Sequence, residues 1–352
     1  MRTTQAAGGS GVQVSGQQIV QRVGAGEAPV GGVRGMFIPH RQLRTEADIQ
    51  AMVEIAVAAK MRVLYPCVLR YSRELFKGAF PRYTYKADGS KPALDDEYRA
   101  FLDHVKAANQ GLAAGAQIEV IPWVEMIINA RTTADEDLLE GGKYEPGTTP
   151  DHQRVLDVSD PGTRDLILRQ LVDLARYDQG SAEAIHVDDH LSYPPHFIDE
   201  AAQAKYVKRM SDFVQWLIPA FKKATGKVFE ISTNKRQWAL DKTQADWAAW
   251  GADRVLVQLY LPSAAAIMGS GKGSATYQQT HAHGGTTLAG IGVTCIANGK
   301  AVPDEDLIKV MKLEARDGKS CIVWHGGDLA KRGPLIKAMA ALAEGSAKAS
   351  AG

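Results

Sequence analysis

Cysteine is scarce in this chain of 352 residues. Its three cysteines, Cys67, Cys295 and Cys321, each lie inside an apolar run, and none belongs to a C-x-x-C pair. An odd number of cysteines without paired spacing argues against a disulfide framework and against a structural zinc site. We therefore expect three buried thiols without a chemical role.

An excess of charge of one sign is also missing. The chain has 41 Lys and Arg residues against 40 Asp and Glu residues, a formal net charge of +1, and no basic stripe. This balance argues against a nucleic acid as partner. No apolar run approaches the roughly 20 residues that cross a membrane, so we expect no membrane partner either.

The N-terminus lacks the apolar core of a secretion signal. Residues 1–30 are rich in Gly, Ser, Gln and Ala, which is typical of a flexible arm or of an arm that becomes ordered on a protein partner. Residues 347–352 have a similar composition and predict a flexible tail. These segments alone leave the cellular compartment undetermined.

Signature motifs of several enzyme classes are absent. No G-x-G-x-x-G turn follows the first predicted strand, and "GSGKGS" (269–274) does not have the lysine spacing of a phosphate-binding loop. There is no G-x-S-x-G elbow for a serine nucleophile. The H-x-H of His281 and His283 lies in a Gly-rich stretch and not on a strand. We therefore expect no catalytic metal and no cofactor.

What the chain does contain is a regular alternation of short apolar runs and longer amphipathic segments. The runs are rich in β-branched residues and apolar on both faces, as parallel strands covered by helices must be. They lie at 33–39, 62–69, 117–125, 183–190, 227–233, 254–261, 287–296 and 320–327. The segments between them predict helices at 45–60, 94–112, 161–177, 199–224, 241–250, 303–317 and 332–344.

Eight strands alternating with helices predict a single (β/α)₈ TIM barrel over residues 31–346. A doubly wound open sheet is the alternative. The connections after strands 2, 3 and 6 are the long ones, at 70–93, 126–160 and 262–286. Because the active site of such a barrel is built at the C-terminal ends of its strands, the residues at those ends are the candidates for function.

The fourth predicted strand, "EAIHVDDH", ends on two adjacent aspartates. Side chains alternate along a strand, so His186 and Asp188 share one face and Asp189 points elsewhere. We expect the face with His186 to point to the barrel axis, because Ile185 and Val187 suit a helix interface. Asp188 and Asp189 are thus catalytic candidates with different roles. The alternative for Asp189 is that it caps the turn or holds His186, His190 or an arginine.

Two glutamates also lie at or near strand ends. Glu125 closes "IPWVE" and Glu230 lies in "VFEIST". Burial would raise the pKa of either carboxyl, as a general acid working near neutral pH requires. The alternative is a structural ion pair inside the barrel with Arg34 or Arg70. The functional interpretation is a pair of carboxylates that flank a scissile glycosidic bond.

Other polar and aromatic side chains gather at the predicted strand ends and are candidates for substrate binding. Aromatic rings suit the apolar faces of sugars. The candidates are Arg70, Trp123, His186, His190, Tyr193, Asn234, Tyr260, Trp324 and His325. Together they favour a carbohydrate-binding cleft.

The chain resembles the glycosyl-hydrolase-like 10 family over about residues 33–345. The resemblance rests on "VRGMFIP" in the first strand, "IEVIPWVE" in the third, "EAIHVDDHLSYPP" in the fourth and "RVLVQLY" in the sixth. It implies a TIM-barrel glycoside hydrolase with Asp188 and Asp189 in the active site and with Arg70, Trp123 and Tyr260 lining it. Glu125 stands where the family often has Asn.

The resemblance also implies a bacterial or extracellular polysaccharide as substrate and an extracellular or cell-surface location. A cytoplasmic or virion-associated location is the alternative. Barrel glycosidases of the α-amylase type place an Asp at the end of strand 4 and a Glu at the end of strand 5, an analogy that favours Asp188 with Glu230.

Two other classes of function stay open. The barrel could be a non-catalytic carbohydrate-binding or structural module of a surface or phage-type assembly, with its N-terminal arm on a partner chain. It could also be a metal-dependent hydrolase.

Overall fold

A computed structural model describes residues 32–70, 73–80, 94–131, 140–146, 153–177, 181–195, 197–268, 286–295, 298–316 and 319–351. The predicted N-terminal arm and the H-x-H of His281 and His283 lie outside these residues.

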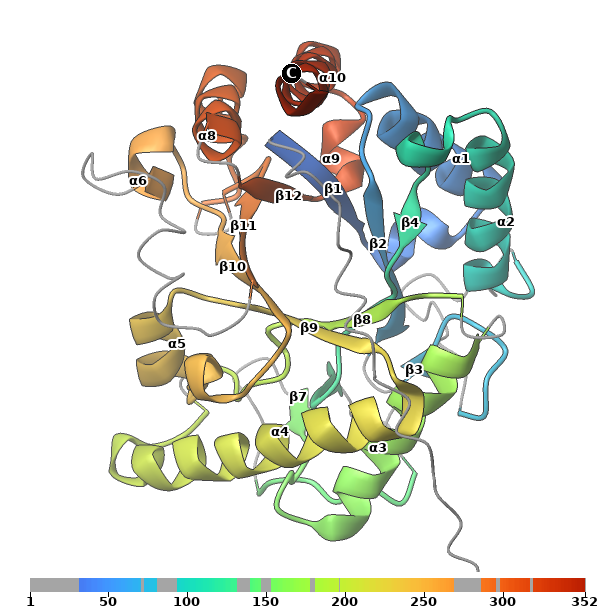
Figure 1. The fold of residues 1–352 in the computed structure, drawn as a ribbon. Helices are drawn as coiled ribbons and strands as arrows, with labels where there is room; N and C mark the ends of the chain where they lie inside the picture. The colour runs from blue at the N-terminus through green and yellow to red at the C-terminus, as the bar shows by residue number, and fades with distance from the viewer. Residues whose placement is uncertain are drawn as a thin grey trace, which may run out of the picture.

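Eight parallel strands close into a barrel, with helices arranged around it (Figure 1). Its closure follows from β1 (Gly32–Ile38), which pairs with β2 (Val63–Arg70) on one side and with β12 (Ser320–Trp324) on the other. The ring continues through β4 (Glu119–Val120) with β5 (Trp123–Val124), β8 (Ala184–Val187), β9 (Val228–Thr233), β10 (Arg254–Leu259) and β11 (Thr286–Gly292). The predicted single TIM barrel is confirmed.

Alternate residues of these strands divide the core into two layers. The barrel interior is filled by one cluster that includes Phe37, Tyr65, Trp123 and Ala184. The other cluster, to which Ile185 and Val187 belong, packs the strands against the helices. The alternation predicted for strand 4 therefore holds, and His186 and Asp188 point to the barrel axis.

Helices surround the barrel, and all but one of the predicted helices lie close to their predicted positions. They are α1 (Glu46–Ala58), α2 (Glu97–Gln110), α3 (Pro161–Arg176), α4 (Gln203–Thr225), α5 (Arg236–Thr243), α6 (Ala264–Met268), α8 (Asp304–Arg316), α9 (Gly326–Leu329) and α10 (Gly333–Ala351). Short 3₁₀ helices lie at His40–Leu43, Ala114–Ala116, Glu200–Ala202 and Trp247–Ala249. The α3 helix begins as its sequence predicts: the Asp160 side chain accepts from the N–H of Thr163 and Pro161 occupies the first turn.

The helix predicted at 241–250 is wrong in position. The structure has α5 earlier, and Gln244 ends it with a left-handed φ of 54°. That conformation cannot continue a right-handed helix, so only a short 3₁₀ turn follows. At the other end of the chain, α10 continues to Ala351 and so includes most of the predicted tail.

The long connections carry small extra elements at the C-terminal end of the barrel. After β2, the two-residue β3 (Arg73–Glu74) folds back antiparallel on that strand. After β5, the antiparallel strands β6 (Ile128–Arg131) and β7 (Gln153–Val155) form a separate ribbon. None of the helices in the described part of the chain has the length and apolar character needed to span a membrane.

Candidate active site

Asp188 directly follows β8 and faces the barrel axis from its C-terminal end. It is 6% exposed, and its Oδ1 accepts three hydrogen bonds. The donors are the Ser232 hydroxyl at 2.7 Å, the Asp189 backbone N–H at 2.8 Å and the Gln258 side-chain amide at 3.2 Å. Because three separate elements hold one oxygen, the orientation of this carboxyl group is fixed.

Glu125 directly follows β5, the neighbouring strand of the barrel. It is 7% exposed, and its Oε2 lies 3.2 Å from Nε of Arg70, the last residue of β2. Burial raises the pKa of the Glu125 carboxyl, although the charges of His190 and Arg70 act in the opposite direction. The raised pKa is what a general acid near neutral pH needs.

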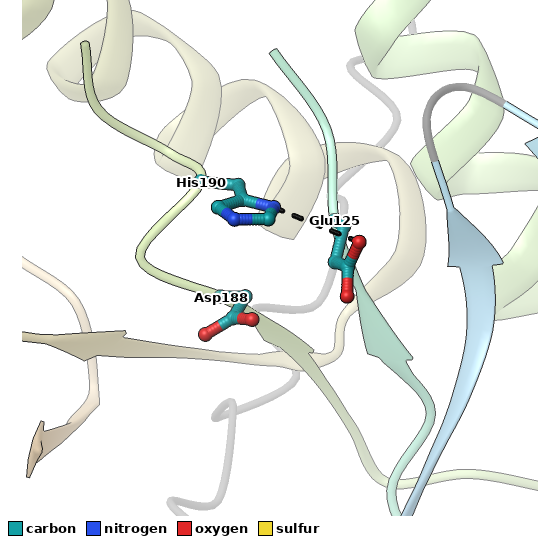
Figure 2. Close-up of side chains that lie close together, drawn as sticks. All are labelled: Glu125, Asp188 and His190. Atoms are coloured by element: carbon teal, nitrogen blue, oxygen red, sulfur yellow. Dashed lines mark ion pairs between the residues drawn. The ribbon is translucent and has the colours of Figure 1, made fainter. Parts of the chain in front are cut away.

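Glu125, Asp188 and His190 point toward one another (Figure 2). One ligand atom of each lies within 4.8 Å of the other two, and His190 Nδ1 is 3.7 Å from Glu125 Oε2. The charges of Glu125, Asp189 and Asp188 raise the pKa of His190 and outweigh its burial, which alone would lower it. The cluster therefore favours an imidazolium beside two carboxyl groups.

Asp189 lies at the same rim with a different environment. It is more exposed than Asp188, and the Asn234 amide lies 3.4 Å from its Oδ2. Burial and the adjacent Asp188 carboxylate raise the pKa of Asp189 to about 7. Asp189 is therefore partly protonated near neutral pH.

The spacing of Glu125, Asp188 and His190 would also allow a cation to be held among them. Carboxylate oxygens and an imidazole are suitable ligands for several divalent metals. Against this, the Arg70 guanidinium already lies 3.2 Å from Glu125 and would repel such an ion. The charge of Arg70 therefore disfavours a divalent cation among these three residues.

Glu230 and His186 lie inside the barrel at the same height along its axis. Both lie below the C-terminal ends of the strands, where Asp188 and Glu125 are. Both are fully buried, and they are register partners in β9 and β8. His186 Nδ1 lies 3.3 Å from Glu230 Oε2, and Arg254 Nε lies 2.6 Å from Oε1. The ion pair thus involves Arg254, whereas the sequence suggested Arg34 or Arg70. Both residues therefore lie one inward position below Asp188 and inside the barrel.

The contacts of Glu230 predict an effect on stability and not on turnover. Burial alone would raise the pKa of Glu230, but the His186 hydrogen bond and the Arg254 charge outweigh it and lower the pKa from 4.5. A lowered pKa in the folded state contributes stability that is present above about pH 4.5 and lost as the pH falls through the folded-state value. We expect Glu230→Gln to reduce the free energy of unfolding by about 3 kcal/mol at pH 7.

Urea denaturation of the wild type and of Glu230→Gln at pH 7 and at pH 4 measures this difference. The gap between the two proteins should narrow at the lower pH. Folded Glu230→Gln that has lost turnover would instead support the catalytic role that the sequence suggested.

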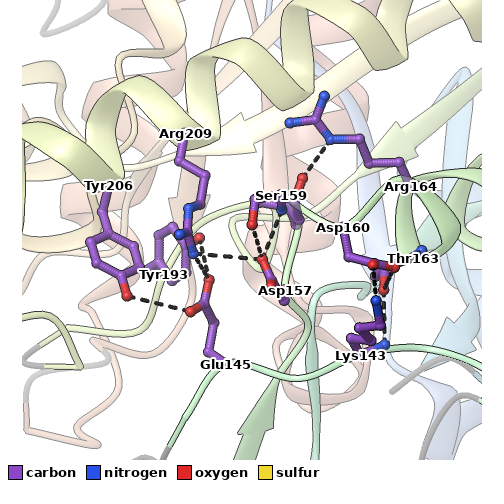
Figure 3. A network of polar contacts seen from close by, with 11 residues as sticks. Lys143, Glu145, Asp157, Ser159, Asp160, Thr163, Arg164, Tyr193, Tyr206 and Arg209 are labelled. Carbon is purple, nitrogen blue, oxygen red and sulfur yellow. Dashed lines mark hydrogen bonds and ion pairs between the residues drawn. The ribbon is translucent and has the colours of Figure 1, made fainter.

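Tyr193 also lies away from the carboxyl cluster. It is fully buried, and its hydroxyl donates to Glu145 Oε1 at 3.1 Å. Tyr206 and Arg209 of α4 reach the same carboxylate, and Arg209 also pairs with Asp157 (Figure 3). This network fastens the connection after strand 3 to α4. The structure therefore gives Tyr193 a contact that supports the loop.

The remaining aromatic candidates form a continuous group near the barrel axis. The Tyr260 and Trp324 rings stack at 5.7 Å, and Trp324 meets Trp123 edge-on at 5.1 Å. Trp123 is almost fully buried, whereas Trp324 keeps some exposure. Burial and the charges of Asp188 and Asp189 raise the pKa of Tyr260 well above its usual range, which keeps a neutral hydroxyl near the two acids.

His325 follows Trp324 and lies in a separate polar contact. Its Nε2 is 3.0 Å from the Arg41 guanidinium and 3.4 Å from Asp328 Oδ2. Burial lowers the pKa of His325, so the ring is neutral near pH 7.

Sequence reasoning missed two residues that hold Asp188, namely Ser232 and Gln258. Both are polar residues at inward positions near the C-terminal ends of apolar strands. A polar residue on the strand face that otherwise carries core residues is a sign of a functional position, and this sign could have identified both residues from the sequence.

The sequence matches no family model, and no curated protein matches it either. Among solved structures, the chain is similar to the PgaB (BpsB) glycoside hydrolase domain from Bordetella bronchiseptica, with a TM-score of 0.54 and 12% identity, covering 88% of this chain and 98% of that one. It is similar to a GH113 β-1,4-mannanase, with a TM-score of 0.53 and 12% identity, covering 89% and 99%.

A third similar structure is the GH20 exo β-N-acetylglucosaminidase from Vibrio harveyi. The TM-score is 0.53 and the identity 13%, and the match covers 89% of this chain and 54% of that one. At such identities the likeness concerns the fold. The chain therefore has the TIM-barrel fold found in these glycoside hydrolases.

Proposed function

We propose that the protein is a glycoside hydrolase that acts on a bacterial or extracellular polysaccharide, with Asp188 and Glu125 as its paired carboxyl groups. The observation that carries the proposal is their geometry: a carboxyl oxygen of each lies within 4.8 Å of the other at the C-terminal end of the barrel. In glycosidases that retain the anomeric configuration the two carboxyl groups are about 5–5.5 Å apart, and in inverting enzymes about 6.5–9.5 Å. The spacing here favours retention.

In this proposal Asp188 is the nucleophile and Glu125 the acid and base. The Glu125 carboxylic acid donates its proton to the glycosidic oxygen while Asp188 attacks the anomeric carbon, so that the leaving sugar departs as an alcohol. A covalent glycosyl ester on Asp188 results. The Glu125 carboxylate then removes a proton from water, the water oxygen attacks the anomeric carbon, and Asp188 is released.

The surroundings of the two residues suit these roles. The three donors to Asp188 Oδ1 hold the nucleophile in place. Burial raises the pKa of Glu125, which is the direction that a general acid requires. Asp189, with a pKa raised to about 7, carries less negative charge near neutral pH than an ordinary aspartate, which weakens its repulsion of the Asp188 carboxylate.

The aromatic and polar groups around the pair suit a sugar substrate. Tyr260 and Trp324 present a stacked aromatic pair beside it, and Arg70, His190 and Asn234 supply hydrogen-bond donors. The fold shared with known glycoside hydrolases supports the same class of reaction.

Incubation of the protein with a panel of bacterial polysaccharides tests the proposal. We expect new reducing ends and shortened oligosaccharides from at least one of them. Binding to a polysaccharide without any release of reducing ends would favour the alternative, a non-catalytic carbohydrate-binding module.

A further inference from the structure

Glu125 is linked to a residue on the first strand connection that the proposed reaction does not use. His40 begins the 3₁₀ helix after β1, and Arg70 Nη1 lies 2.6 Å from its Nδ1 and 2.8 Å from its Nε2. The same arginine reaches Glu125 Oε2 through Nε at 3.2 Å. His40, Arg70 and Glu125 thus form a chain across three neighbouring barrel strands.

We propose that His40 is a positioning residue, which holds the Arg70 guanidinium against Glu125. The inference rests on the proposed role of Glu125 as acid and base. A guanidinium has only donors, so a partner on its other side must offer an acceptor. The imidazole of His40 offers one as long as the ring is neutral.

The environment of His40 keeps the ring neutral. Burial, followed by the charges of Arg70, Arg41 and Arg44, lowers the pKa of His40 from 6.5 to about 3. A protonated ring would have no acceptor nitrogen and would repel Arg70. The Arg70–His40 contact therefore persists at any pH near neutrality.

Holding Arg70 in place matters because its side chain has a route to water. It is 23% exposed, against 9% for the Glu125 side chain. We expect the guanidinium to turn toward solvent, where its charge is screened, more readily when His40 is removed. Glu125 would then lose the favourable charge of Arg70 and keep the favourable charge of His190 and the unfavourable charge of Asp188. The carboxylate form of Glu125 would become less favourable, so its pKa would rise.

The consequence for the reaction concerns the charge that forms on Glu125. When the acid gives up its proton, the carboxylate that appears is stabilised by a guanidinium already in position. Arg70 thus limits how far burial raises the pKa of Glu125, and His40 keeps Arg70 there.

The test measures the Glu125 carboxyl directly and needs no substrate. Protein labelled with ¹³C at the glutamate side-chain carboxyl is titrated by NMR, and the Glu125 signal is identified by its loss in Glu125→Gln. We expect Arg70→Met to raise the titration midpoint by about one pH unit. His40→Ala should raise it by a smaller amount, and His40→Gln, which restores an acceptor, should bring it back toward the wild type.

His104→Ala is the matched control, because His104 pairs with Glu46 on the surface between α2 and α1. It should leave the Glu125 midpoint unchanged. Circular dichroism verifies that each variant is folded. If His40→Ala fails to fold, His40→Leu replaces it as the variant without an acceptor: the inference predicts a raised midpoint in His40→Leu and a midpoint near the wild type in His40→Gln.

An unchanged midpoint in folded His40→Ala, with a raised midpoint in Arg70→Met, would overturn the role of His40. An unchanged midpoint in both would overturn the role of the whole chain. Neither result depends on turnover. Failure of the proposed glycosidase function would appear separately, as activity that survives in Glu125→Gln.

Discussion

Asp188→Asn should reduce turnover on a hydrolysed polysaccharide on the order of 10⁴-fold. The variant removes the nucleophile but keeps its shape, and the asparagine carbonyl can still accept from Ser232 and Gln258. Binding of the polysaccharide should therefore stay within about threefold of the wild type, since few contacts change. Reducing-end assays measure turnover, and calorimetry measures binding.

Two further variants give this result its meaning. Asp189→Asn should keep considerably more activity than Asp188→Asn, because Asp189 faces Asn234 and does not share the three donors that hold Asp188. Asp212→Asn, in an exposed ion pair with Lys208 on α4, should behave like the wild type. Equal losses in Asp188→Asn and Asp189→Asn would contradict the separate roles given to the two aspartates.

Glu125→Ala should lower turnover by about 10²–10⁴-fold, the usual contribution of a general acid. The size of the loss should depend on the leaving group. A substrate whose leaving group departs without protonation, such as an aryl glycoside with an acidic phenol, should be affected least, because it does not need the Glu125 proton in the first step. Comparison of kcat/KM for the polysaccharide and for an aryl glycoside measures this difference.

A small nucleophile adds a second readout for the same variant. Glu125→Ala removes the carboxylate that would deprotonate water and leaves a cavity in its place. Azide needs no deprotonation, so it should enter this cavity, accelerate the second step and yield a glycosyl azide. Glu54→Gln is the control, since Glu54 lies on the exposed face of α1 and accepts a hydrogen bond from Gln50. Losses of the same size on both substrates, without azide rescue, would show that Glu125 is not the acid and base.

The barrel could be predicted because its signal is local. Each strand is a short apolar run, and the alternation within "AIHVD" placed Asp188 on the barrel axis and Ile185 and Val187 against the helices. A period of two is a property of the strand itself and needs no knowledge of partners.

The choice between Glu125 and Glu230 could not be made from the sequence. Both lie on the inward side of the barrel, Glu125 after β5 and Glu230 in β9, the two strands that flank β8. What separates the two glutamates is their height along the barrel axis. That height depends on the register between strands, which pairs Glu230 with His186 and with Arg254. Glu230 therefore lies one inward position below Ser232, the residue that contacts Asp188. Apolar pattern alone does not specify such a stagger.

Tyr193 illustrates a second limit. It follows the two aspartates closely, so proximity in sequence suggested a place in the site. The chain turns away after Leu191, and the Tyr193 hydroxyl reaches Glu145, which belongs to a different connection. A long-range polar contact of this kind has no periodic signal.

The stereochemistry of the product tests the central claim most directly. In a retaining enzyme the first product has the anomeric configuration of the substrate, and ¹H NMR during the first minutes of hydrolysis detects it before mutarotation. The spacing of Asp188 and Glu125, with carboxyl oxygens within 4.8 Å of each other, predicts retention. An inverted first product would contradict the account, because it would require a water between carboxyl groups that stand too close together to hold one.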